Sequence, residues 1–229
     1  MTSAVIVAAG KSARMGAGVD KLFLEVNGRP LVSHTWRTFD SCARVDEIII
    51  VVRDGTQASF NDLAGKLEFK KQFHVVAGGK ERQDSVWNGL DAISPACEIV
   101  VIQDAARPCT TERLIADTIQ AAREVGAAVA AQRVTDTIKE SDGGTMIQRT
   151  IDRARLWAVQ TPQTFQAEVI RRALAAVRER GLMVTDDTAA CELIGQPVKL
   201  VESLSLNPKV TSLMDLPLIE MLLRGVCSA

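Results

Sequence analysis

Small and basic residues that could hold a phosphate follow the first apolar run of this sequence. Residues 3–7 form that run, and Ala8-Ala9-Gly10 comes directly after it. Arg14 and Lys21 lie a few residues further along. A loop of small residues exposes backbone N–H groups, and cations beside it add positive charge, so the loop can bind an anion. The stretch therefore predicts an anion site, and the alternative is a surface loop that is merely basic.

Two familiar phosphate-binding motifs are excluded at this loop. Walker A needs an earlier glycine at the position of Val5. The dinucleotide-binding fingerprint, started at Gly10, needs its second glycine at the position of Ser12. The loop is thus neither a P-loop nor a dinucleotide-binding turn.

Two later segments carry further cations, and a third ends a predicted strand with an aspartate. Gly78-Gly79-Lys80-Glu81-Arg82 follows an apolar run, Asp104 ends another, and Lys209 lies in a loop near the end of the chain. Cations can take up the charge of a triphosphate, and Mg²⁺ needs only one or two carboxylates when phosphate oxygens complete its coordination. The set predicts a nucleoside triphosphate site with Mg²⁺ on Asp104.

Alternating elements would position these segments. Apolar runs predict strands at 3–7, 47–52, 73–77, 98–104, 127–131, 156–160 and 198–201. Helices are predicted at 31–42, 57–66, 82–93, 110–125, 166–180, 185–195 and 213–223. This alternation is typical of an α/β fold with a doubly wound, mostly parallel sheet, which binds ligands at the carboxyl ends of its strands.

A polar hairpin interrupts the pattern at about 134–155. Residues 134–140 and 145–151 alternate between polar and apolar, with a turn at 141–144. The hairpin has too few apolar residues for a core of its own. We therefore expect a protruding arm that packs against a second copy of the chain in a homodimer. The alternative is a loosely packed excursion on a monomer.

Composition limits the class of protein. The 229 residues are 47% hydrophobic, which suits one large α/β domain over 1–229. The formal net charge of -1 argues against a general nucleic-acid binder, and no apolar run reaches the length of a membrane span. We expect no signal peptide before the first strand. Five cysteines without a CxxC pair predict reduced thiols and a cytoplasmic location.

Seven motifs, taken in order, resemble the 2-C-methyl-D-erythritol 4-phosphate cytidylyltransferase family of the non-mevalonate isoprenoid pathway. The resemblance runs from about Val5 to Thr211. The motifs are Ala8-Ala9-Gly10 with Arg14-Met15-Gly16 and Lys21, Glu81-Arg82-Gln83-Asp84-Ser85-Val86, Asp104-Ala105-Ala106-Arg107-Pro108, Asp136-Thr137-Ile138-Lys139, Leu156-Trp157 with Thr161-Pro162-Gln163, Thr185-Asp186-Asp187, and Lys209-Val210-Thr211.

The resemblance implies a reaction. A phosphate oxygen of the polyol phosphate attacks the α-phosphate of CTP, and pyrophosphate leaves. The attacking phosphate is already ionised, so no general base is needed, and catalysis consists of positioning and charge stabilisation. The resemblance implies that Arg14 and Lys21 stabilise the transition state and that Asp104 holds Mg²⁺. Arg153 and Lys209 would position the methylerythritol phosphate.

The resemblance also implies residues that bind the substrates. Three threonines would lie near the polyol phosphate, namely Thr137, Thr161 and Thr185. Backbone and small side chains would hold the cytidine nucleotide, namely Ala8, Ala9, Gly10, Gly78, Gly79, Arg82 and Ser85. Backbone carbonyls can accept hydrogen bonds from the cytosine amino group. In the family the arm interlocks two subunits, which implies that Thr137 and Arg153 serve the neighbour's site.

Three positions depart from the family pattern. Gln103 stands where His is expected, Asp20 where Pro is more familiar, and Pro208 where an aliphatic residue is usual. We expect Gln103 to alter the surroundings of the following aspartate. Asp20 can offset part of the charge of Lys21, and Pro208 stiffens its loop.

Several residues near the motifs have simpler structural interpretations. Arg107 can brace its loop through an ion pair as readily as it can bind substrate. Asp186 and Asp187 can be acids at the start of a helix, where the dipole favours them. Nothing beside Cys109 marks an activated thiol.

Two other functions compete with the family's reaction. The chain could be a cytidylyltransferase for another polyol phosphate, such as ribitol 5-phosphate. It could also be a catalytically silent nucleotide-binding scaffold, against which the joint presence of Arg14, Lys21, Asp104, Arg153 and Lys209 argues.

Overall fold

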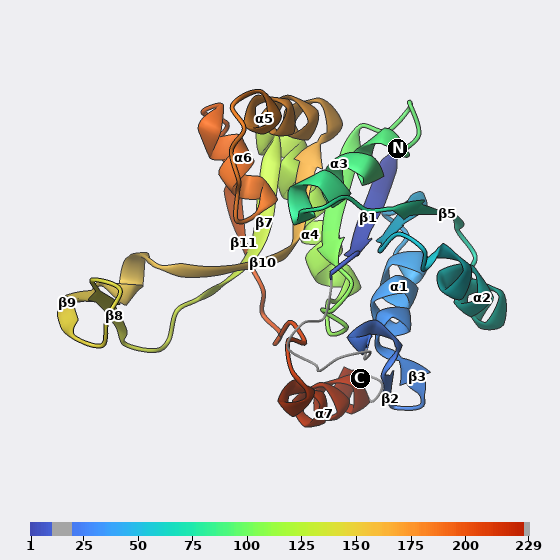
Figure 1. The fold of residues 1–229 in the computed structure, drawn as a ribbon, viewed down its shortest axis with the longest axis horizontal. Coiled ribbons are helices and arrows are strands. Elements are labelled where there is room, and N and C mark those ends of the chain that lie inside the picture. The colour runs from blue at the N-terminus through green and yellow to red at the C-terminus, as the bar shows by residue number, and fades with distance from the viewer. Residues whose placement is uncertain (11–19, 227–229) are drawn as a thin grey trace.

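A seven-stranded sheet forms the centre of the molecule (Figure 1). The structure is a computed structural model that describes residues 1–10 and 20–226. The strands are β1 (Thr2–Ala8), β2 (Glu25–Val26), β3 (Arg29–Pro30), β4 (Glu47–Val52), β5 (Gln72–Ala77), β6 (Ile99–Asp104), β7 (Ala127–Arg133), β8 (Ile138–Ser141), β9 (Ile147–Ile151), β10 (Trp157–Gln166) and β11 (Lys199–Glu202). The sheet order is β11-β7-β10-β6-β1-β4-β5, and only the pairs that involve β10 are antiparallel. The predicted α/β class with a mostly parallel sheet is confirmed.

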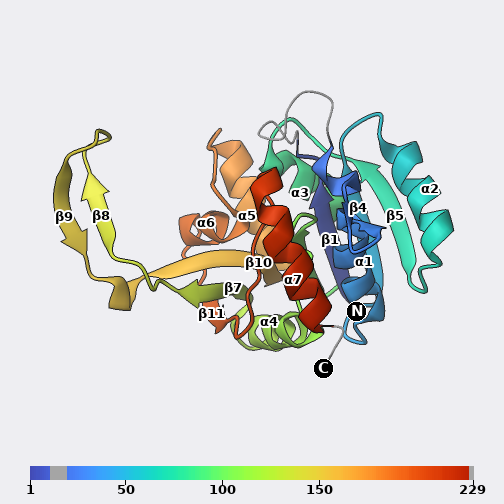
Figure 2. The ribbon, with the colours of Figure 1, turned by 90° about the horizontal axis from the view of Figure 1, so that it is seen from below.

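Helices cover both faces of this sheet (Figure 2). They are α1 (Leu31–Ser41), α2 (Gln57–Leu67), α3 (Arg82–Asp91), α4 (Glu112–Val125), α5 (Ala167–Glu179), α6 (Asp187–Leu193) and α7 (Leu216–Val226), with short 3-10 helices η2 (Lys21–Phe23), η3 (Arg153–Arg155) and η4 (Leu213–Asp215). Ile6 and Ile50 share one core with residues of α1, α2, α4 and α7, while Val5 and Ile49 share the other with α3, α5 and α6. Strands buried on both faces must be apolar throughout, which explains runs such as β4.

The strand register brings four loops to one edge of the sheet. Val7 of β1 is level with Asp104 of β6. Ala8 is level with Val52 of β4, which in turn is level with Ala77 of β5. The segments that begin at Ala9, Arg53, Gly78 and Ala105 therefore start side by side.

One strand differs from the prediction. The sequence pattern predicted a short strand at 156–160, but β10 continues from Trp157 to Gln166. It lies antiparallel between β6 and β7, and its register against β7 shifts between Val159 and Gln163. Pro162 lies inside this shift, where its missing N–H removes little of the hydrogen bonding between the strands. In the sequence, this proline indicated that the strand ends before it.

The hairpin of β8 and β9 forms an arm that extends from the body (Figure 2). These two strands pair with each other and with no other described strand. Within the described residues, no helix is long and apolar enough to cross a membrane.

Candidate active site

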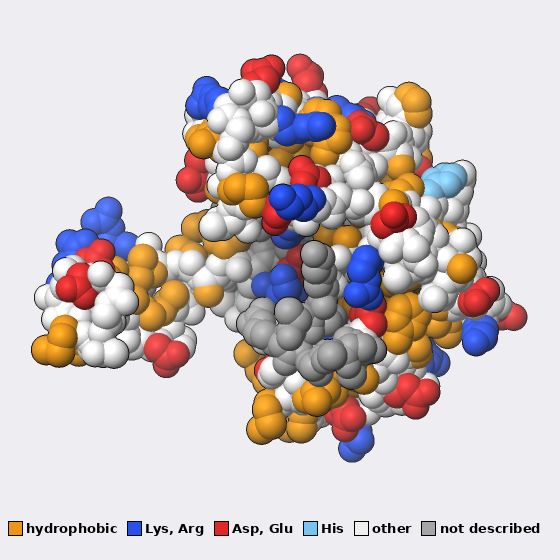
Figure 3. All heavy atoms as spheres, in the orientation of Figure 1, with side chains coloured by type: hydrophobic (Ala, Val, Ile, Leu, Met, Phe, Trp, Pro, Cys, Tyr) orange, Lys and Arg blue, Asp and Glu red, His pale blue; other side chains and the backbone are white. Residues whose placement is uncertain are grey.

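A cleft of about 760 Å³ opens where the strand ends meet. In the space-filling view, basic and acidic side chains lie near the centre of the face that Figure 3 presents. The lining residues are Val7, Ala8, Ala9, Gly10, Lys21, Leu22, Arg53, Asp54, Gly78, Gly79, Lys80, Glu81, Arg82, Ser85, Asp104, Ala106, Lys209 and Thr211. All four segments that the sequence singled out thus meet in one cleft.

Asp104 is the carboxylate around which the cations gather. Lys209 Nζ lies 2.8 Å from its Oδ2, and Arg107 Nε lies 3.6 Å from the same oxygen. Arg82 Nε lies 3.6 Å from Oδ1. Burial alone would raise the pKa of Asp104, but Lys209, Arg82 and Arg107 together hold it below its ordinary value. The carboxylate is therefore ionised at neutral pH.

The surroundings of Asp104 fit a divalent metal that arrives with a phosphate-bearing ligand. No group of three or more His, Cys, Asp or Glu residues among the described ones could form a protein cage. Asp104 Oδ1 faces Arg82 at 3.6 Å, which is beyond hydrogen-bonding distance, so this oxygen can still accept a ligand. One carboxylate plus phosphate oxygens is an arrangement that suits Mg²⁺.

Lys21 reaches the cleft from the start of η2. Its Nζ donates to the Val210 carbonyl at 2.8 Å, next to Lys209 in the chain. Asp20 caps η2 by accepting from the Leu22 N–H, and its other oxygen lies 2.6 Å from Arg53 Nη2. The Asp20 carboxylate is therefore bound to Arg53, a cation that also lines the cleft.

Glycines let the wall of the cleft pack tightly around Ala9 and the start of α3. A Cβ on Gly78 would lie 2.6 Å from Ala9 Cβ, and one on Gly79 would lie 2.3 Å from Asp84 Cβ. Ser85 is buried, and its hydroxyl accepts from the Gly79 N–H and donates to the Glu81 carbonyl. Ser85 thus holds the loop whose backbone faces the cleft.

A buried hydrogen-bond network lies behind Asp104. The Asn207 amide donates to the Thr161 carbonyl at 2.8 Å and accepts from the Thr110 hydroxyl at 3.0 Å. Thr110 also accepts from Gln103, the residue that replaces the expected histidine. Thr161 Oγ1 accepts from the Asp104 N–H at 3.0 Å. Thr161 therefore supports Asp104 from behind, and it does not line the cleft.

Arg107 braces this network. Its Nη1 donates to the Asn207 carbonyl at 2.7 Å, while its Nε faces Asp104. Burial lowers the pKa of Arg107, but the adjacent carboxylate counteracts this effect. The simpler interpretation of Arg107 as a structural ion pair agrees with these contacts.

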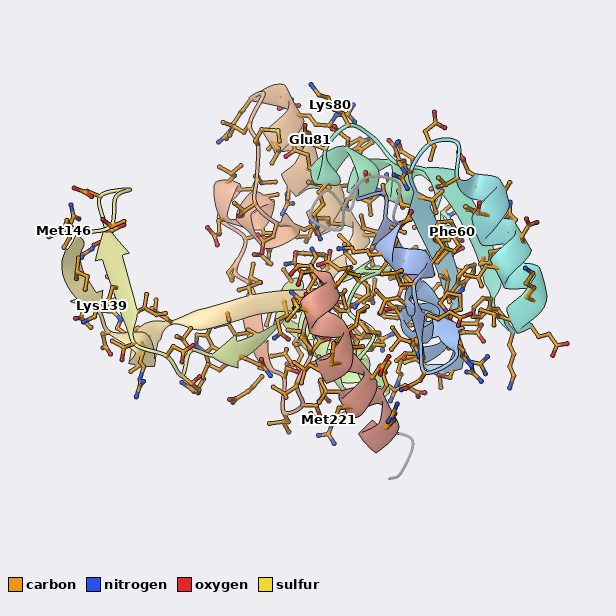
Figure 4. The ribbon with its side chains drawn as sticks, turned by 60° about the horizontal axis from the view of Figure 1, so that its bottom comes forward. Phe60, Lys80, Glu81, Lys139, Met146 and Met221 are labelled. Carbon is orange, nitrogen blue, oxygen red and sulfur yellow. The ribbon has the colours of Figure 1, made fainter. Side chains whose placement is uncertain are left out.

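Besides Thr161, three expected site residues lie outside the cleft, and one is not described. Thr137 and Arg153 are exposed on the arm, where Arg153 donates to the Thr135 carbonyl. In Figure 4 the labelled Lys139 and Met146 on the arm lie well apart from Lys80 and Glu81 at the start of α3. Thr185 is exposed beside the N-cap of α6. Arg14 lies outside the described residues.

The sequence interpretation missed cleft residues and one buried acid. Arg53 and Asp54 line the cleft directly after β4, and the rule that ligands bind at strand ends could have found them. Asp186 is the N-cap of α6, as expected of a helix-start acid. Asp187 is instead fully buried, with Oδ2 at 2.8 Å from Arg82 Nη1. Burial raises the pKa of Asp187, while Arg82 counteracts it.

The described cysteines show no features of a nucleophile. Cys42, Cys97, Cys109 and Cys191 are free thiols. Burial raises the pKa of Cys109 to about 11. It likewise raises the pKa of Cys191 to about 12, so neither thiol ionises at neutral pH.

Comparisons with known proteins all identify one family. The family model described as 2-C-methyl-D-erythritol 4-phosphate cytidylyltransferase matches residues 2–225. A curated protein of that name from Geobacillus kaustophilus is 41% identical over 220 residues, which cover 96% of this chain and 96% of the relative. One from Caldanaerobacter subterraneus is 41% identical over 223 residues, which cover 97% and 98%.

Solved structures give the same result. The chain superposes on 4-diphosphocytidyl-2C-methyl-D-erythritol synthase from Anaerococcus prevotii with a TM-score of 0.86 and 30% identity, covering 97% of this chain and 96% of the other. The 2-C-methyl-D-erythritol 4-phosphate cytidylyltransferase from Thermus thermophilus gives a TM-score of 0.79 and 32% identity, covering 98% and 100%.

Proposed function

Since this chain belongs to the 2-C-methyl-D-erythritol 4-phosphate cytidylyltransferase family, we propose that the cleft around Asp104 is its active site. The enzyme is a nucleotidyltransferase that transfers a cytidylyl group from CTP to 2-C-methyl-D-erythritol 4-phosphate in isoprenoid precursor biosynthesis. The observation that carries the assignment of the site is the contact of Lys209 with Asp104 in a cleft that Lys21 and Arg82 also line.

The residues of the cleft suit a displacement at phosphorus. An oxygen of the polyol phosphate forms a bond to the α-phosphorus of CTP, and the bond to the bridging oxygen breaks, so pyrophosphate leaves with the electron pair. Lys21 would stabilise the charge that develops in this step, as we expect also for Arg14. Lys209 would orient the attacking phosphate.

Enzymes of this family use CTP with a divalent metal ion, and we assign Mg²⁺ to Asp104. When bound, the ion would neutralise triphosphate charge. Asp104 would then exchange some of its contact with Lys209 for the metal. Lys209 would be released to the incoming phosphates.

The glycine-lined wall of the cleft would hold the base. Ala8, Ala9 and Gly10 line the cleft together with Gly78 and Gly79, and their backbone carbonyls would supply acceptors. Acceptors there would pair with the cytosine amino group. Uracil has no amino group, so it would leave these acceptors unpaired. We expect CTP to be preferred over UTP.

The arm would complete the site of a second copy in a homodimer. Arg153 and Thr137 lie on the arm and do not line their own cleft. Met146 and Ile147, also on the arm, are 76% and 64% exposed, which is apolar surface that a partner could cover. We propose that Arg153 and Thr137 serve the partner's cleft, while each chain folds as one catalytic domain over 1–229 and works in the cytoplasm.

A turnover assay tests the proposed function. Purified protein with Mg²⁺ should release pyrophosphate from CTP only when 2-C-methyl-D-erythritol 4-phosphate is added. EDTA should abolish the activity, and added Mg²⁺ should restore it. Replacing CTP by UTP should lower kcat/KM by at least about a hundredfold, because buried acceptors lose their donor.

Ribitol 5-phosphate serves as the comparison substrate in this assay. A higher kcat/KM with ribitol 5-phosphate would show that ribitol 5-phosphate is the substrate. Absence of turnover with both polyols, in protein that still binds CTP, would instead favour the silent nucleotide-binding scaffold.

A further inference from the structure

A buried acid beside the cleft has no role in the reaction described above. Asp187 is fully buried at the first position of α6. Within the described part of the chain, neither of its carboxylate oxygens accepts a well-aligned hydrogen bond. Its ionic partner is Arg82, whose Nη1 lies 2.8 Å from Oδ2. Burying a carboxylate costs free energy of folding, and pairing with a cation often only repays that cost. The pair of Asp187 and Arg82 therefore needs a further explanation.

The surrounding contacts fix Asp187 in place. Its backbone N–H donates to Gln163 Oε1 at 3.0 Å, and Gln163 Nε2 donates to Asp186 Oδ2 at 3.0 Å. Gln83, the neighbour of Arg82, accepts from the Val184 N–H and donates to the Leu182 carbonyl. The start of α3 is therefore tied to the loop that leads into α6, and Asp187 is held at a set place relative to Arg82.

Arg82 lies between two carboxylates at unequal distances. Its Nη1 contacts Asp187 at 2.8 Å, while its Nε remains 3.6 Å from Asp104 Oδ1. The guanidinium of arginine can pair with a carboxylate through two parallel N–H groups, and that is its preferred geometry. Here Arg82 does not pair with Asp104 in that way, and its shorter contact is with Asp187.

We propose that Asp187 is a positioning residue that holds Arg82 back from Asp104 and so keeps Asp104 Oδ1 open for the metal ion. The proposal rests on the assignment of the metal to Asp104 made above. Without the Asp187 charge, Arg82 would move toward Asp104 and compete with the metal ion for Asp104 Oδ1. Residues that orient a metal ligand from behind commonly change metal affinity about 10–100-fold when they are lost.

The test measures metal binding without turnover. Mn²⁺ replaces Mg²⁺ and is titrated by electron paramagnetic resonance into protein saturated with a non-hydrolysable CTP analogue, with no polyol phosphate present. Asp187→Asn should weaken Mn²⁺ binding about tenfold or more. Affinity for the metal-free analogue should stay the same or increase, because the variant adds net positive charge to the cleft.

The matched control is Asp186→Asn, the same change one residue earlier. Asp186 caps α6, and within the described residues it forms no ion pair with Arg82. Asparagine caps a helix about as well as aspartate, so both stability and Mn²⁺ affinity should change little, the affinity by no more than about twofold. Asp187→Ser is the second variant if Asp187→Asn does not fold.

A double variant separates positioning from a general electrostatic effect. In an Arg82→Met background, Asp187→Asn should have no further effect on Mn²⁺ affinity. Wild-type affinity in both Asp187 variants, or an equal loss in the Arg82→Met background, would overturn the proposal. Undiminished Mn²⁺ binding by Asp104→Asn would instead overturn the assignment of the metal, so the two failures can be told apart.

Discussion

At the scale of single residues, the site is an arrangement of charges around one aspartate. Asp104 stays ionised because Lys209, Arg82 and Arg107 outweigh the effect of its burial. Since its pKa is lowered in the folded chain, these ion pairs stabilise the fold at neutral pH. Their contribution is lost as the pH falls through the folded-state pKa of Asp104.

Lys21 provides the clearest prediction at this scale. Its ammonium would stabilise charge that develops in the transition state, so Lys21→Ala should lower kcat by on the order of 10²–10³. Lys21→Gln, which keeps a hydrogen-bond donor but no charge, should lose nearly as much. Steady-state kinetics with varied CTP measures kcat and KM. A loss confined to KM, with kcat unchanged, would refute the assigned role.

The cleft residues that could be predicted from the sequence are those whose residue type and position belong to a recognisable motif. Lys21, Asp104 and Lys209 belong to motifs of the family and were predicted from them. The pairing of Asp187 with Arg82 could not be predicted, because it joins α6 to α3 through tertiary packing. The ion pair between Asp20 and Arg53, which joins η2 to the end of β4, was not predicted either.

At the scale of elements, strand register determines which loops meet. The apolar runs predicted nearly all strands of the main sheet, because strands covered on both faces need continuous apolar residues. The antiparallel direction of β10 could not be predicted from its own composition, and Pro162 concealed its length. Yet β10 supplies both Thr161, which supports Asp104, and Gln163, which holds Asp187.

The close packing of the 78–79 loop leads to a prediction about this wall. A Cβ at Gly79 would lie 2.3 Å from Asp84 Cβ, so Gly79→Ala must push the loop away from α3. We expect a loss of about 1–3 kcal/mol in the free energy of unfolding and a higher KM for CTP.

Gly65→Ala in α2 is the matched control for this prediction. Apart from its chain neighbours and the backbone of its own helix, no described atom lies within 4 Å of the added Cβ, so the change should raise stability by up to about 1 kcal/mol and leave KM unchanged. Thermal unfolding and steady-state kinetics measure both effects. Wild-type values for Gly79→Ala would show that the packing of this loop does not shape the nucleotide site.

At the scale of the whole molecule, the arm is the part whose proposed role requires a second chain. The body contains a cleft with Lys21 and Lys209, whereas Arg153 and Thr137 lie on a hairpin outside it. The polar composition of the hairpin predicted a protruding arm, because such a segment cannot form its own core. We therefore propose that one chain's cleft and its partner's arm form a single active site.

Mixing two inactive variants tests this claim most directly. Lys21→Ala carries a defect in the cleft and Arg153→Ala a defect on the arm, and each should be nearly inactive alone. The two are unfolded, mixed in equal amounts and refolded, and dimer formation is checked by size-exclusion chromatography. If Arg153 serves the partner, each mixed dimer has one site with both defects and one site with neither. Random pairing in a two-fold dimer makes about half of the dimers mixed, so about a quarter of wild-type activity should return. No return of activity in confirmed dimers would contradict the shared site.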